Sequence, residues 1–270
     1  MSEVARALTI AGSDSGGGAG IEADLKTFTA LGVYGMAAVT SITAQNTCGV
    51  YSVYDVPAQM VTAQIDAVTE DIGVDAAKTG MLSNAEIVEG VCESIRRNQI
   101  SRLVVDPVMI AKSGDALLQP DAIKTFITRM IPLAFLITPN IPEAEKLTGQ
   151  KISTVSDVNP VIKHIADLGA KNVLLKGGHM GGKYAVDWLY DGENLTEFTA
   201  PRINTHNTHG TGCTLSAAIT AFLAKGINLY DAVRSAKNYL TVAIRHSFDL
   251  GKGVGPLNHF WVFSELEEDR

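Results

Sequence analysis

Basic residues, cysteines and long apolar runs are all scarce in this sequence, and each shortage excludes a class of protein. The 22 Lys and Arg residues are outnumbered by 29 Asp and Glu, and the net charge of −7 argues against nucleic acid as the main partner. No apolar run approaches the roughly 20 residues that cross a bilayer, and no basic segment followed by an apolar stretch marks a secretory signal. We therefore expect neither a membrane protein nor a secreted one.

The three cysteines are too few for a disulfide or zinc framework. Cys48, Cys92 and Cys213 form an odd set, which favours reduced thiols and predicts a cytoplasmic location. His206 and His209 precede Cys213 closely and raise the question of a metal site. Because no second pair of ligands accompanies them, zinc is disfavoured.

Short apolar runs alternate with amphipathic stretches along the chain. Hydrophobic residues make up 46% of the 270 residues, enough to bury a large core. The alternation is typical of βα units, so we expect one α/β domain over residues 1–270, with a mostly parallel sheet and helices on both faces. The expected strands are 8–11, 36–42, 76–79, 103–105, 135–138 and 173–176, with an antiparallel hairpin at 185–190 and 195–198. The expected helices are 21–31, 57–71, 84–98, 120–130, 141–147, 158–168, 213–225 and 230–247, and the charged tail after Phe263 is expected to fray.

Polar or glycine-rich segments follow five of these strands directly. They begin at Gly12, Gly80, Asp106, Pro139 and Gly177. Ligands in open α/β sheets bind beyond the carboxyl ends of the strands, so these loops are expected to line one crevice.

The strongest single motif is Asn204–Cys213, N-T-H-N-T-H-G-T-G-C, which ends where a helix of small residues begins. A Gly-Thr-Gly turn at a helix start points several backbone N–H groups at one spot, where the helix dipole adds positive potential. Gly210, Thr211 and Gly212 therefore predict a site for a phosphoryl group in transfer. Cys213 is expected to project into this site, with its thiol pKa lowered toward neutrality. The alternative is an ordinary helix start with an inert, buried Cys.

The glycine-rich loop Gly12–Gly20 is open to a second interpretation, because Gly18, Gly20 and Ala23 have the spacing of a dinucleotide fingerprint. That fingerprint needs an acidic residue about 20 positions further on to hold the ribose. The region Thr40–Asn46 has no carboxylate, so a dinucleotide-dependent oxidoreductase is disfavoured. The chain also lacks the G-x-x-x-x-G-K-[ST] pattern of P-loop kinases.

Charged and amide side chains stand at the ends of other strands. Asp106 ends one apolar strand, and Asn140 and Glu143 follow the next. Magnesium in phosphoryl transfer is held through one or two carboxylates, so this pattern predicts a magnesium site, with helix capping as the alternative for Asn140. Lys176 ends a further strand and is suited to an ATP phosphate. Gln45 carries the donor and acceptor that an aminopyrimidine edge requires.

Six segments resemble one known family. They are A-G-S-D-S-G-G-G-A-G-I-E-A-D at 11–24, D-P-V-M-I-A-K-S-G at 106–114, T-P-N-I-P-E-A-E at 138–145, L-L-K-G-G-H at 174–179, the Gly-Thr-Gly-Cys turn at 210–213 and G-V-G-P-L-N-H-F at 253–260. With them the chain resembles the hydroxymethylpyrimidine/phosphomethylpyrimidine kinases of thiamine biosynthesis, within the ribokinase-like superfamily. The resemblance runs in order over nearly the whole chain.

The resemblance implies a ribokinase-like, three-layer αβα fold and an ATP- and Mg²⁺-dependent kinase. Its acceptors would be 4-amino-5-hydroxymethyl-2-methylpyrimidine and then the monophosphate of that alcohol. The pyrimidine pocket would contain Gln45, Gly12, Asp24, Met81 and Val108. The ATP and magnesium side would contain Asp106, Asn140, Glu143, Lys176 and Lys237, with Gly210, Thr211 and Gly212 as the anion hole. On its position alone, Asp24 is equally explained as a solvated acid at a helix start.

Most ribokinase-like enzymes have an Asp base where this chain, like the pyrimidine-kinase branch, has Cys213. A thiolate there could accept the hydroxyl proton, although a loose phosphoryl-transfer transition state does not require a strong base. The nearest alternative activity is that of a pyridoxal kinase, which Gln45 and Met81 disfavour. A non-catalytic ligand-binding protein is disfavoured by the intact Asp106 and Lys176. The resemblance also suggests a homodimer and leaves a requirement for K⁺ open.

Overall fold

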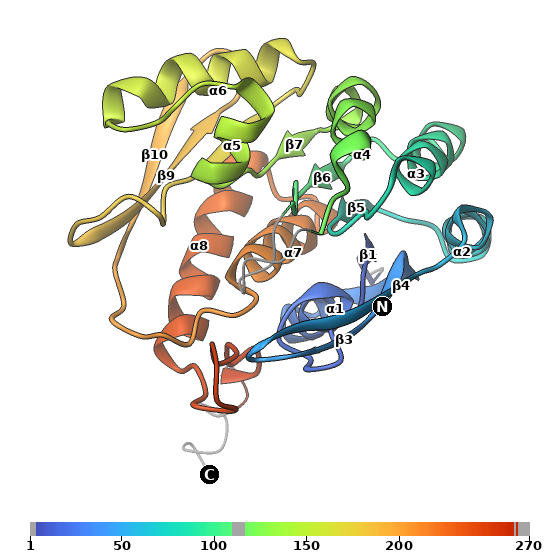
Figure 1. The fold of residues 1–270 in the computed structure, drawn as a ribbon, viewed down its shortest axis with the longest axis horizontal. Helices are drawn as coiled ribbons and strands as arrows, with labels where there is room; N and C mark the ends of the chain where they lie inside the picture. The colour runs from blue at the N-terminus through green and yellow to red at the C-terminus, as the bar shows by residue number, and fades with distance from the viewer. Residues whose placement is uncertain (1–3, 110–116, 262, 264–270) are drawn as a thin grey trace.

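The computed structural model describes residues 4–109, 117–261 and 263, and its centre is an eight-stranded sheet (Figure 1). The order across the sheet is β10-β9-β8-β7-β6-β5-β1-β2. Its strands are β1 (Arg6–Ala11), β2 (Tyr34–Val39), β5 (Ala76–Thr79), β6 (Leu103–Val105), β7 (Leu136–Ile137), β8 (Val173–Lys176), β9 (Tyr184–Tyr190) and β10 (Leu195–Pro201). Neighbouring strands along β8-β7-β6-β5-β1-β2 pair in parallel. Strand β9 pairs antiparallel with both β8 and β10, as expected from the sequence.

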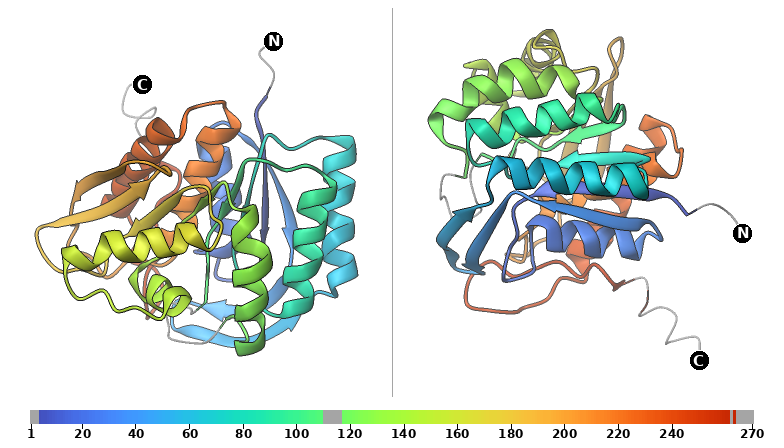
Figure 2. Two further views of the ribbon diagram at one scale, coloured as in Figure 1. Left: turned by 90° about the horizontal axis from the view of Figure 1, so that it is seen from above. Right: turned by 90° about the vertical axis from the view of Figure 1, so that its right-hand side faces the viewer.

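Helices cover both faces of this sheet, and Figures 1 and 2 show them in two layers. They are α1 (Gly20–Ala30), α2 (Ala58–Asp71), α3 (Ala85–Arg97), α4 (Pro120–Thr125), α5 (Ile141–Thr148), α6 (Val158–Asp167), α7 (Thr211–Ala224) and α8 (Leu229–Arg245). Helices α2 to α6 pack into one hydrophobic core, and α1, α7 and α8 pack into the other. Successive strand residues point to opposite faces, so Leu103 and Val105 enter the first core and Val104 enters the second. The three-layer αβα prediction is confirmed.

The strand expected at 36–42 is the main error in the sequence-based prediction. It breaks at Thr40, whose N–H donates to the carbonyl of Ala11 (3.0 Å) and whose hydroxyl donates to the carbonyl of Met81 (2.7 Å). The chain then leaves the sheet as β3 (Ser41–Asn46), which pairs antiparallel with β4 (Gly49–Asp55) in a separate two-stranded sheet. Strand β4 was not predicted, because most of its side chains are exposed and its sequence has no buried face.

One predicted helix differs from the structure in its type, and two predictions fall outside the described residues. The helix expected at 120–130 is helical to Thr125 and continues as a π-helical turn, Phe126–Met130. The tail expected to fray after Phe263 and positions 110–114 of the motif 106–114 lie outside the described residues. Among the described helices, none is long and apolar enough to cross a membrane.

Candidate active site

A cavity of about 670 Å³ lies beyond the carboxyl ends of β1, β5, β6 and β8. Parallel strands bring their following loops to one edge, which is why residues far apart in sequence meet there. The cavity is lined by all the residues expected at the site except Asp24, namely Gly12, Gln45, Met81, Asp106, Val108, Asn140, Glu143, Lys176, Gly210, Thr211, Gly212, Cys213 and Lys237.

Helix α7 begins at this cavity with the Gly-Thr-Gly turn. Its N-cap Gly210 has φ +83°, and a Cβ there would overlap the carbonyl of Gly18, so only glycine fits. A Cβ on Gly212 would lie 3.4 Å from Nζ of Lys176, which places the helix start directly opposite that lysine. The N–H of Thr211 donates to the carbonyl of Thr208 at 3.3 Å, but the amides that follow it in the first turn of α7 precede the regular helical bonding, and the helix dipole reinforces them. This end of the cavity is therefore built to hold an anion.

Three charged side chains stand opposite the α7 start. Nζ of Lys176 lies 2.8 Å from Oδ1 of Asp106 and 4.0 Å from Oε2 of Glu143. Asp106 also accepts hydrogen bonds from Thr138 and Ser216, both at 3.2 Å. These bonds fix the Asp106 carboxylate at the end of β6.

Asn140 caps α5 as the capping alternative requires, because its side chain accepts from the Glu143 N–H (2.9 Å) while Glu143 accepts from the Asn140 N–H (2.7 Å). Burial raises the pKa of Glu143 to about 7, with Lys176 opposing that rise and the charge of Asp106 adding to it. For Asp106, Lys176 and Lys78 outweigh burial and hold the pKa below its usual value. Asp106 and Glu143 thus present carboxyl oxygens beside Lys176, and oxygen donors of this kind suit a hard divalent cation such as Mg²⁺.

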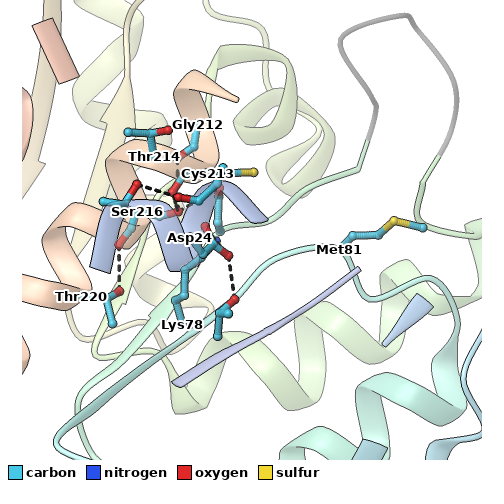
Figure 3. A network of polar contacts seen from close by, with 12 residues as sticks. Asp24, Lys78, Met81, Gly212, Cys213, Thr214, Ser216 and Thr220 are labelled. Carbon is cyan, nitrogen blue, oxygen red and sulfur yellow. Dashed lines mark hydrogen bonds and ion pairs between the residues drawn. The ribbon is translucent and has the colours of Figure 1, made fainter. Parts of the chain in front are cut away.

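The structure places Asp24 beneath the cavity rather than on its wall, which corrects the expectation that it lines the substrate pocket. Its side chain is fully buried, and Oδ2 lies 2.8 Å from Nζ of Lys78 and accepts a 2.6 Å bond from the hydroxyl of Thr9. Figure 3 shows this pair under the start of α7. Lys78 does line the cavity, and a lysine inside the wholly buried strand β5 was the sequence signal that could have revealed it.

The expectation of a low thiol pKa for Cys213 is wrong. Desolvation raises the pKa of this thiol to about 11. Lys78 and a hydrogen bond from the Gly20 amide lower it, but the nearby Asp24 and Asp106 carboxylates raise it again. Cys213 is therefore a neutral thiol at physiological pH, one that can both donate and accept a hydrogen bond.

The other end of the cavity is less charged. Gly12 lies against Met81, since a Cβ at position 12 would be 3.1 Å from the Met81 sulfur. Gln45 follows a bulge in β3, where its Oε1 accepts a 3.3 Å bond from the Thr43 hydroxyl. With Val108 these residues line a mostly apolar part of the cavity, here called the slot, in which Gln45 supplies one amide.

Two further pairs of polar side chains at the cavity were not predicted from the sequence. Lys237 on α8 pairs with Asp187 on β9 at 2.6 Å, and Asp187 also accepts from the Gly177 N–H at 3.0 Å. His209 lies 2.8 Å from Asp14, so it bonds a carboxylate rather than serving a metal cluster with Cys213. Burial raises the pKa of Asp14, but His209 and backbone amides lower it further, so that it lies below its usual value.

One cavity thus combines an apolar wall with a single amide, a thiol, a helix start suited to an anion, and a lysine beside two carboxylates. On this fold, such an arrangement defines a ribokinase-like kinase that transfers a phosphoryl group to a small molecule. The phosphomethylpyrimidine kinase family matches residues 14–258, and the chain belongs to that family.

Individual relatives agree with this assignment. The chain is 49% identical to the hydroxymethylpyrimidine/phosphomethylpyrimidine kinase of Haemophilus influenzae, over 98% of this chain and all of the relative. It is 52% identical to the enzyme of the same name from Rhizobium meliloti, over 94% of this chain and 96% of that one. Among solved structures, the ADP complex of Bacillus subtilis pyridoxal kinase superposes with a TM-score of 0.89 at 42% identity, covering 97% of this chain and 100% of that chain. The phosphomethylpyrimidine kinase of Clostridium difficile 630 gives 0.80 at 49% identity, covering 90% and 100%.

Proposed function

We propose that this kinase uses ATP to phosphorylate 4-amino-5-hydroxymethyl-2-methylpyrimidine and then its monophosphate, as a step of thiamine biosynthesis. The observation that carries the proposal is that Cys213, in the first turn of α7, lines the same cavity as Gly12, Gln45 and Met81. A pyrimidine held in the slot directs its hydroxymethyl group past the thiol toward the anion site.

Each end of the cavity has its own task in this reaction. The Gln45 amide pairs with the polar edge of the ring, and Met81 and Val108 cover its faces. Lys176 and the amides at Gly210–Gly212 bind the γ-phosphoryl group, and Lys237 supplies a second cation to the nucleotide side. Asp106 and Glu143 would hold Mg²⁺, which neutralises charge on the β- and γ-oxygens when bound.

Cys213 orients the acceptor hydroxyl as a neutral thiol. A loose transition state leaves most of the negative charge on the phosphoryl oxygens. The bond from the γ-phosphorus to the ADP oxygen breaks with its electron pair left on ADP, and the hydroxyl proton can pass late to an oxygen of the transferred group, after the new O–P bond has largely formed. A base that is ionised beforehand is then unnecessary. The amides of α7 and Lys176 stabilise the charge that the reaction does concentrate.

A coupled assay for ADP with three acceptors tests the substrate assignment. We expect turnover of the pyrimidine alcohol and of its monophosphate, and a lower kcat/KM for pyridoxal. No turnover of the monophosphate, together with a higher kcat/KM for pyridoxal, would identify the chain as a pyridoxal kinase instead. That alternative is kept because the superposed Bacillus subtilis structure carries the name pyridoxal kinase.

We also infer a homodimer that pairs through the sheet of β3 and β4. Ile42 and Tyr54 are cross-strand partners there, with exposed fractions of 54% and 67%, and Tyr51 on β4 is 69% exposed. A run of exposed apolar side chains on a thin, two-stranded sheet favours burial against a second copy. In sedimentation, the wild type should be a dimer and Tyr54→Arg should be a monomer.

The cytoplasmic location remains a prediction, supported by three cysteines that are all unpaired. A dependence on K⁺ is tested by replacing K⁺ with Na⁺ in the assay.

A further inference from the structure

His209 and Asp14 join two loops that are 195 residues apart in sequence and line the same cavity. Nε2 of His209 lies 2.8 Å from Oδ2 of Asp14. The exposed fractions are 8% for His209 and 1% for Asp14, so water competes little for this contact. Because an ionised carboxylate only accepts hydrogen bonds, Nε2 carries the proton.

On the Asp14 side, the contact organises the glycine-rich loop between β1 and α1. The Asp14 carboxylate accepts from the backbone N–H groups of Gly16 (2.8 Å), Gly18 (3.1 Å) and Ala19 (2.9 Å). The N–H of Asp14 donates to Glu22 in the first turn of α1 at 2.7 Å. The Asp14 carboxylate therefore fixes the backbone conformation of this loop.

On the His209 side, the contact holds the residue that precedes the α7 cap. The His209 N–H donates to the carbonyl of Gly255 at 3.1 Å, and its ring packs so closely on Gly18 that a Cβ there would overlap it. Gly210, the next residue, rests in turn on the carbonyl of Gly18. The position of the α7 start is thus set by the Asp14 loop, through Gly18 and through the hydrogen bond between His209 and Asp14.

We propose that His209 and Asp14 are a positioning pair for phosphoryl transfer, which fixes the α7 amides where they meet the transferred group. The proposal rests on the kinase reaction proposed above and assigns the pair no contact with substrate. Loss of the pair lets the α7 start shift relative to Lys176, and a displacement of about 1 Å in such a site can lower the rate on the order of 10²-fold.

The test is a double-mutant cycle on kcat, built from His209→Leu, Asp14→Asn and the double variant. We expect His209→Leu to lower kcat by roughly 10²-fold while KM for the pyrimidine alcohol changes by less than about threefold. The Asp14 loop bonds Gln45 of the slot through Ser15, and in this variant the loop keeps its own backbone bonds to the Asp14 carboxylate. The double variant should lose no more than the worse single variant, because both changes break one contact. His209→Gln, which keeps an N–H donor, should recover most of kcat.

His206→Leu is the matched control, because this histidine lies on the same loop and pairs with a carboxylate, Asp249, but is 69% exposed at its side chain. It should keep wild-type kcat. Additive losses in the cycle, or a His209→Gln variant as slow as His209→Leu, would overturn the proposal. If circular dichroism shows that His209→Leu does not fold, the cycle is built from His209→Gln and Asp14→Asn instead. Additive losses of kcat in that cycle would also overturn the proposal. If the wild type prefers pyridoxal, the substrate assignment fails, and the cycle is run with pyridoxal as acceptor.

Discussion

Lys176 and Asp106 form a buried ion pair across the ends of β8 and β6, with 2.8 Å between Nζ and Oδ1. Glu143 stands 4.0 Å from the same Nζ, so one lysine balances two carboxylates. We expect an ATP phosphate to compete with Asp106 for this lysine when the nucleotide binds.

Lys176→Met should therefore lose both activity and stability. We expect kcat to fall on the order of 10²-fold, the usual cost of removing one transition-state charge stabiliser. The free energy of unfolding should fall by about 3 kcal/mol, because Asp106 is left buried without its partner. Lys151→Met, which breaks the exposed pair with Glu145, is the control and should change neither quantity appreciably. If Lys176→Met keeps the wild-type kcat, Lys176 does not stabilise the transition state.

Cys213 offers a test of orientation against base catalysis. Because burial raises the pKa of its thiol to about 11, Cys213 should act without ionising. Cys213→Ser keeps a donor and an acceptor and should retain kcat within about tenfold, whereas Cys213→Ala should lose roughly 10²-fold. The wild-type kcat should show no tenfold rise per pH unit between pH 7 and 9. Such a rise, with Cys213→Ser as slow as Cys213→Ala, would show that a thiolate base is required.

The sequence predicted the layered sheet and most of the cavity wall for the same reason. Apolar strands followed by polar loops mark both the parallel sheet and the edge where its loops converge, so Asp106, Glu143 and Lys176 could be placed at that edge. Charge partners could not be placed, because pairs such as Asp24 with Lys78 join separate elements. The pKa of the Cys213 thiol likewise depends on tertiary contacts, because burial of the thiol outweighs the lowering by Lys78 and the Gly20 amide.

The Lys78–Asp24 pair should be a large contributor to stability. Both side chains are fully buried, so Lys78→Met leaves an uncompensated carboxylate beneath the cavity. We expect a loss of about 3–5 kcal/mol in the free energy of unfolding by urea denaturation. The double variant Lys78→Met/Asp24→Leu should recover most of that loss, because it removes both charges. A double variant as unstable as the sum of the singles would mean that packing, not charge, is what the pair provides.

His259 should make the fold sensitive to acid. Its Nε2 lies 2.9 Å from the hydroxyl of Thr214 in the first turn of α7, and the side chain is buried. Burial, aided by Lys26, lowers the pKa of His259 from 6.5 to about 4, so between these values the unfolded chain binds a proton that the folded chain does not. The resulting stability is fully present above pH 6.5 and is lost as the pH falls toward 4, by about 3 kcal/mol in total.

His259→Gln isolates this effect, because glutamine can still bond Thr214 but does not titrate. The free energy of unfolding should be measured for the wild type and the variant in urea at several pH values from 7.5 to 4.5. Other titrating groups cancel in the difference between the two proteins, which should shift in favour of the variant as the pH falls. If the difference between the two proteins stays constant with pH, His259 is not the group that links folding to acid.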